Sequence, residues 1–242
     1  MPSLKKAVAT IHRDREWWRK ILLGGALWLT VVGYPIVEGY QIESIDNTKN
    51  GYPTPLPRWS DLGTKMVQGI FGLLIDFFYF IFPLLASGMV LLCSALALSL
   101  TGETGDLLRL VGQTIGLIVL LWLLLAWMLG VSPIGKRLFV GEGQPNQALS
   151  SKVVRGALSQ EARGIYLRAR LLSLPLYLVP LALLTAAWLG ADRGRWLALL
   201  LLWLGLSALL YARLATVQLY DLAAREIERR RFEAFRARSR VS

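Results

Sequence analysis

Residues that commonly carry chemistry are scarce in this sequence. Its 242 residues include one cysteine, Cys93, and one histidine, His12. A single cysteine excludes a disulfide within the chain, and the two residues together supply too few ligands for a zinc site. His12 lies outside the apolar runs, so no Ser-His-Asp set is available inside a membrane. The sequence therefore predicts no metal site, no cofactor and no catalytic centre.

Charged residues are also few. They make up 18% of the chain, whereas apolar residues make up 55%, and the mean hydropathy is +0.48. A water-soluble domain of ordinary composition carries about 25% charged residues. A chain this apolar is expected to have the bilayer as its solvent, which predicts an integral membrane protein.

The charge that is present is strongly basic, with a formal net charge of +11. The basic residues gather in three blocks beside apolar runs, as expected if they set the membrane topology and contact anionic headgroups. This placement argues against nucleic-acid binding. Membrane lipids are the partners that the charge pattern predicts.

Long apolar runs predict the transmembrane helices, each of which needs about 20 residues. A shorter run, 21–37, contains Gly24, Gly25, Gly33 and Pro35. Its length and composition suit a re-entrant or in-plane helix, which is tolerated at membrane depth where other helices bury it. Four runs are long enough to cross completely: 70–100, 110–131, 171–190 and 196–216.

Lysine and arginine counts in short connecting segments predict the orientation. The segments 1–20, 132–170 and 217–242 are the basic ones, so both termini and the central segment are expected in the cytoplasm. Five full crossings cannot satisfy this pattern. The predicted fold is therefore an all-α polytopic bundle of four full transmembrane helices, preceded by the re-entrant or in-plane helix 21–37, with the whole transmembrane domain at 21–216.

A competing arrangement keeps 21–37 as a crossing helix. The run 70–100 would then be a re-entrant pair broken between Pro83 and Gly88, and the loop 38–69 would lie outside. We favour the first arrangement because one long tilted helix explains the run more simply than a bent pair.

The basic segments should contact the membrane surface. Within 1–20, an interfacial helix would place Trp17 and Trp18 at headgroup level, with Arg19 and Lys20 on water or phosphate. The segment 132–170 is expected to begin with turns and continue as an amphipathic surface helix, and 217–242 to continue the last span as a helix. Headgroup contacts are also expected from Lys136 and Arg137.

One carboxylate lies inside an apolar run. Asp76, in LLIDFFYF, is costly at that depth, so it is expected to face the bundle or stay near the interface. As a proton or cation site it would be supported by Tyr79, three residues later; as a structural residue it would bond a hydroxyl or backbone amide. Arg213 is expected to snorkel to the cytoplasmic surface rather than pair with Asp76, and Glu38 to lie at an interface.

The polar segment 38–69 is predicted to be a stiff, proline-rich loop. Glycine permits a positive φ, and closely spaced prolines impose extended geometry. Such a loop could brace helix ends or present a strip to a protein partner. The residues expected to form this partner-contact loop are Gly39, Tyr40, Gly51, Pro55, Pro57 and Trp59.

The same segment resembles a known family. The pair Gly39-Tyr40, then Gly51, then Leu56-Pro57-x-Trp59, then Gly69 opening the next apolar run, is similar to the bacterial and archaeal domain-of-unknown-function family 4013 (DUF4013). The resemblance extends over roughly residues 10 to 215. It implies a multi-span protein of a prokaryotic inner or internal membrane, with no assigned activity.

Three functions follow from these observations. The first is a non-catalytic subunit or assembly factor of a larger membrane complex, bound to a membrane-protein partner or to further copies of itself. The second is a small transporter or channel that uses Asp76. The third, a lipid-modifying enzyme, has the least support because the histidine and paired carboxylates expected at such an active site are missing from the apolar runs, which leaves Cys93 without a partner there.

Overall fold

The computed structural model describes residues 2–101, 106–192 and 194–239, and every regular element in them is helical. The elements are α1 Leu4–His12, α2 Trp17–Trp28, α3 Gly33–Lys49, α4 Leu62–Asp76, η1 Phe77–Ile81, α5 Phe82–Thr101, α6 Asp106–Leu129, α7 Val131–Glu142, α8 Pro145–Ala148, α9 Ser151–Leu158, α10 Arg163–Ser173, η2 Leu174–Tyr177, α11 Leu178–Leu189 and α12 Arg195–Ser239.

Four of these helical stretches are long and apolar enough to cross a membrane. They are Leu62–Ser99, Leu110–Leu129, Arg163–Leu189 and Arg195–Ala237. Each contains most of one predicted span, so the all-α membrane fold with four candidate transmembrane helices is confirmed. The first and third stretches begin earlier than predicted because amphipathic turns precede their apolar parts.

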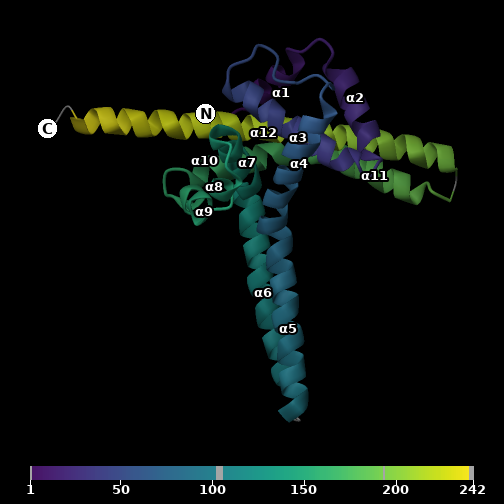
Figure 1. Cartoon of the computed structure of the whole chain (residues 1–242), viewed down its shortest axis with the longest axis vertical. Coiled ribbons are helices and arrows are strands. Elements are labelled where there is room, and N and C mark those ends of the chain that lie inside the picture. The colour runs from purple at the N-terminus through teal and green to yellow at the C-terminus, as the bar shows by residue number, and fades with distance from the viewer. Residues whose placement is uncertain (1, 102–105, 193, 240–242) are drawn as a thin grey trace.

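The long helices form two hairpins (Figure 1). α5 pairs with α6, and α11 pairs with the first half of α12. The remaining short helices surround the middle of α12, and the two hairpins leave this helical centre in different directions (Figure 1). The chain is therefore organised around a junction from which two separate apolar hairpins extend.

The first long helix is continuous. α4, a π-helical turn (η1) and α5 follow one another without a break, and α5 passes straight through Pro83 and Gly88. The run 70–100 is therefore part of one long helix, as we favoured, and not a re-entrant pair broken between Pro83 and Gly88. The π-helical turn begins directly after Asp76, and such turns inside α-helices are frequent at functional sites.

The segment 21–37 is two helices rather than one. α2 ends at Trp28, and α3 begins at Gly33 after a turn in which the Thr30 hydroxyl donates to Leu27 O and accepts from the Gly33 amide. The turn is apolar and exposed, with Val31 93% accessible. A helical hairpin with an apolar tip is compatible with a re-entrant segment, and that assignment stays a prediction.

The proline-rich loop is shorter than expected. α3 continues to Lys49 and α4 begins at Leu62, which leaves only 50–61 outside the helices. α3 and α4 pack with their backbones almost touching, because a Cβ on Gly39 would lie 1.7 Å from Lys65 O and one on Gly69 would lie 1.7 Å from Pro35 O. Only glycine permits this approach, so these two residues of the family-like pattern serve helix packing.

Candidate functional site

A cluster of four charged side chains lies where α3, α4, α7 and α12 meet. Asp76 is the last residue of α4, and Lys136 lies in α7. α7 follows α6 after Gly130, whose φ of +65° favours glycine. We call the group the four-charge cluster; its members are Glu38, Asp76, Lys136 and Arg213.

Lys136 is the central member of the cluster. Its Nζ lies 2.5 Å from Glu38 Oε1 and 2.6 Å from Asp76 Oδ2. Arg213 approaches from the other side, with Nη2 2.8 Å from Glu38 Oε2 and 3.8 Å from Asp76 Oδ2. The Ser132 hydroxyl, one turn before Lys136 on α7, donates to Asp76 Oδ1. Each carboxylate is therefore held by both bases.

The charges balance in an environment that excludes most water. Side-chain exposure is 1% for Glu38 and 5% for Lys136. Burial by itself favours the neutral acid, but the nearby positive charges of Arg213 and Lys136 outweigh it and hold the pKa of Glu38 below its ordinary value. The cluster is thus a set of ion pairs. Removing one member would strongly destabilise the folded protein, because a buried charge would be left unpaired.

Arg213 is further fixed by an aromatic ring. Its guanidinium carbon lies 5.4 Å from the centroid of the Trp28 ring, a cation-π distance. The expectation that Arg213 snorkels to the surface is wrong, because two carboxylates and an indole hold it inside the protein. Glu38, expected at an interface, is also buried.

The two acids and two bases of the cluster neutralise one another. In the part of the chain that the structure describes, no group of three or more histidine, cysteine or acidic residues could hold a metal ion. The two carboxylates of the cluster are neutralised by protein cations. The ion pairs join the N-terminal helices to α7 and α12, and the side chains of Asp76 and Arg213, 26% and 21% exposed, can be reached from outside.

Asp76 and Tyr79, predicted to act together, have different partners in the structure. Asp76 joins the four-charge cluster, whereas the Tyr79 hydroxyl donates to Ala148 O at 2.6 Å. Tyr79 thereby attaches the π-helical turn to α8. The two residues lie near one another in sequence but hold different parts of the helical centre.

The residues predicted to contact a partner through the loop point mostly inward. Tyr40 is fully buried and stacks on Trp59 with ring centroids 4.0 Å apart. Pro55 and Pro57 are buried as well, while Gly51, with a φ of +74°, is exposed. Gly39 contacts α4, as described above. These positions therefore hold the fold together, and the exposed surface of the loop comes from other residues, including Tyr52, Pro53, Thr54 and Arg58.

Some of the residues predicted to contact headgroups are exposed, and others bind within the protein. Trp18 and Arg19 are exposed and form a cation-π pair at 5.1 Å, and Trp17 stacks on His12. Lys20 instead binds Asp14 at 2.6 Å and donates to Leu56 O.

The two basic residues of α7 also form internal ion pairs. Lys136 is buried in the cluster, and Arg137 pairs with Asp221 at 3.1 Å and Glu228 at 3.0 Å. For Lys136 the headgroup prediction is wrong, because its ammonium is enclosed by protein carboxylates.

Asp76 stands out in the sequence, but the other members of the four-charge cluster do not. Glu38, Lys136 and Arg213 each stand near the end of an apolar run, where a charge is ordinarily assigned to the membrane surface. One signal was available: two acids and two bases at such positions can neutralise one another. The pattern did not show which of them meet, because they come from four helices.

Taken together, the apolar hairpins and the buried ion pairs define an all-helical integral membrane protein. A family model described as "Protein of unknown function (DUF4013)" matches residues 22–190. The match spans more than half of the chain, so the chain belongs to this family. It includes three members of the four-charge cluster, and Arg213 lies beyond it. Searches among curated proteins and among solved structures gave no match.

Proposed function

We propose that this protein is a non-catalytic subunit or assembly factor of a larger membrane complex. The observation that carries the proposal is the exposure of the α5–α6 hairpin, which the rest of the chain hardly covers. In the most apolar window of Leu62–Ser99 none of the described residues is buried, and in that of Leu110–Leu129 the buried share is 6%. A hairpin so little covered by its own chain offers two faces to other helices.

The arrangement of the hairpins supports the same conclusion. α5 makes its main contacts with α6 and η1, and α11 makes its main contact with α12. The hairpins extend in different directions (Figure 1), so the chain by itself does not assemble its long helices into one bundle. Helices in membranes associate through close packing and small residues, and a partner would complete that packing.

A suitable contact point exists on α6. A Cβ at Gly116 would meet no atom within 4 Å, so this small residue faces away from the rest of the chain. Ile118, two residues later and 60% exposed, lies on nearly the opposite face. The two positions allow the same side chain, phenylalanine, to be placed on different sides of one helix.

The test is extraction in mild detergent followed by sizing and mass spectrometry. The native chain is expected in a stoichiometric assembly, Gly116→Phe is expected to leave that assembly, and Ile118→Phe is expected to remain in it. A native chain that migrates alone, with lipid and detergent covering the hairpin, would contradict the proposal. A homo-oligomer would identify the partner as a second copy.

A second candidate, transport through Asp76, is favoured by the π-helical turn that follows this residue and by its partial exposure. Its test is ion or proton flux in reconstituted vesicles, where Asp76→Asn should abolish flux while the protein still inserts. Flux that is equal in Asp76→Asn and native vesicles would end this candidate.

A further inference from the structure

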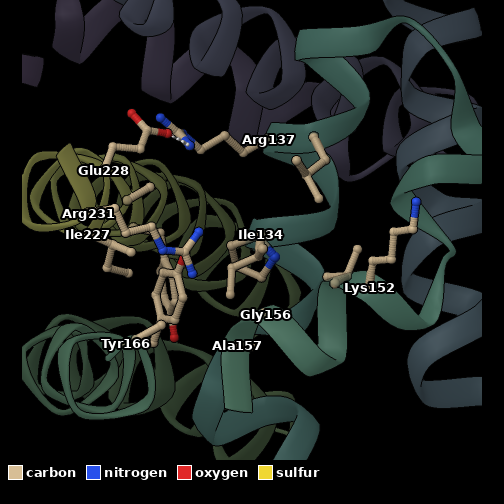
Figure 2. Close-up of a pocket in the computed structure, with 15 residues that line it drawn as sticks. Ile134, Arg137, Lys152, Gly156, Ala157, Tyr166, Ile227, Glu228 and Arg231 are labelled. Carbon is tan, nitrogen blue, oxygen red and sulfur yellow. Dashed lines mark hydrogen bonds and ion pairs between the residues drawn. The ribbon is translucent and has the colours of Figure 1, made fainter. Parts of the chain in front are cut away.

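A cavity of about 230 Å³ lies beside the four-charge cluster but is separate from it. α7, α9, α10 and α12 form its walls (Figure 2). α7 starts two residues after α6 ends, and α10 opens the third candidate span. The cavity therefore lies at the end of two candidate membrane helices.

The charged residues that line the cavity are mainly basic. Arg137, Lys152 and Arg231 line it together with one acid, Glu228. Figure 2 shows Arg231 and Glu228 on α12 and Lys152 on the α9 side, where its side-chain nitrogen points away from Arg231. The lining carries an excess of two positive charges, which suits an anionic ligand.

These bases are not all committed to internal partners. Arg231 is 3.5 Å from Glu161, and both side chains are more than half exposed, which makes the pair weak. Lys152 is exposed, and within the described residues it has no ion-pair partner. Arg137 is held by Asp221 and by Glu228, and the Glu228 side chain is 62% exposed. An incoming anion could therefore displace Glu228 from Arg137 without unpairing Asp221.

The rest of the lining is apolar. Ile134, Val153 and Ile227 line the cavity, and so does Gly156, which has no neighbouring atom within 4 Å of a Cβ placed on it. A ligand with a charged head and a carbon chain matches this division. The volume is below the roughly 300 Å³ at which pockets for whole drug-sized ligands begin, so it suits a phosphate and the first carbons attached to it.

We propose that this cavity binds the phosphate headgroup of an anionic phospholipid at the end of α6. Arginine fits phosphate through paired N–H donors, and lysine supplies a point charge. Basic pockets between membrane helices are suited to such headgroups. The bound phosphate would contact Arg137 and Arg231, and the glycerol carbons would lie over Ile134 and Gly156.

The experiment uses the full-length protein in neutral detergent, titrated with phosphatidylglycerol or phosphatidylcholine and followed by native mass spectrometry. The native protein is expected to retain one phosphatidylglycerol in preference to phosphatidylcholine. Arg231→Gln should weaken this binding about tenfold, since it removes a charge-assisted contact. Arg236→Gln removes the same charge from a part of α12 that does not line the cavity, and should change nothing.

A second variant tests whether lipid binding needs the space of the cavity as well as its positive charge. Gly156→Leu fills open space and is expected to abolish selective lipid binding while leaving the thermal unfolding temperature unchanged, as should the control Gly63→Leu, which also faces open space. Selective retention that persists in Gly156→Leu would overturn the proposal. Equal retention of the two lipids by the native protein would also overturn it, as would stabilisation by inorganic phosphate alone with no response to phosphatidylglycerol.

Discussion

Lys136 and Glu38 are 98 residues apart in sequence, and their charged groups lie 2.5 Å apart in the structure. Lys136 also contacts Asp76, so one ammonium group serves carboxylates from two different helices. α7 therefore connects α3 and α4 through a single side chain. Removing the Lys136 ammonium would leave the two acids with Arg213 as their common partner.

Lys136→Met is accordingly expected to destabilise the protein by about 3–5 kcal/mol, because it leaves a buried charge uncompensated. The measurement is thermal unfolding of the detergent-solubilised chain. Lys152→Met, which removes an exposed lysine from α9, should shift the unfolding temperature little. A Lys136→Met protein as stable as the native one would mean that the cluster does not stabilise the fold.

Acid should weaken the same cluster. The pKa of Glu38 in the folded chain lies below its ordinary value of 4.5, with burial opposing the shift and Arg213 and Lys136 imposing it. The stability that the ionised carboxylate contributes is therefore fully present above its unfolded-state pKa and is lost as the pH falls below it. Unfolding temperatures recorded from about pH 5 down to about pH 2 should fall, and Glu38→Gln should make that fall shallower. Identical slopes for the two proteins would contradict the assignment.

Gly69→Ala tests the contact between α3 and α4. A Cβ at this position would lie 1.7 Å from Pro35 O, so the helices must separate at a cost of about 1–3 kcal/mol or more. Gly63→Ala, on the same helix but facing open space, is the matched control and should be neutral or slightly stabilising. The comparison requires only unfolding temperatures of the two variants, and equal values would show that the close approach is not needed.

Trp59→Ala should act on folding rather than on partner binding. Its ring stacks on Tyr40, and its Nε1 donates to Lys20 O at 2.9 Å. Truncation should cost about 3–5 kcal/mol, measured by thermal unfolding. Tyr52→Ala, in the same loop with its side chain exposed, should change stability by less than about 0.5 kcal/mol. If Trp59→Ala instead left stability unchanged and released a partner, the loop would be the docking surface first expected.

The membrane fold could be predicted because its signal is local. Runs such as 110–131 are apolar over the length of a bilayer, and no tertiary contact is needed to recognise them. The helical tail was equally readable, since α12 continues from Arg195 to Ser239 without a break. Composition and length therefore specified the class of the fold.

The site could not be predicted in the same way because it depends on contacts distant in sequence. Asp76 stood out inside an apolar run, but Glu38 and Arg213 resembled ordinary interfacial charges. Local composition was also misleading at 38–49, where polar residues suggested a loop. There the Gly39 and Gly69 contacts hold α3 against α4, and tertiary packing overrides local preference.

The order of residues in the four-charge cluster has a consequence for biosynthesis. Translation delivers Glu38 and Asp76 first, Lys136 much later and Arg213 last. Until α12 has been made and has docked, the growing chain carries more acid than base at this junction. The polar centre of the protein can therefore close only after α12 is in place, so a chain that lost α12 would keep its α5–α6 hairpin but not a neutral core.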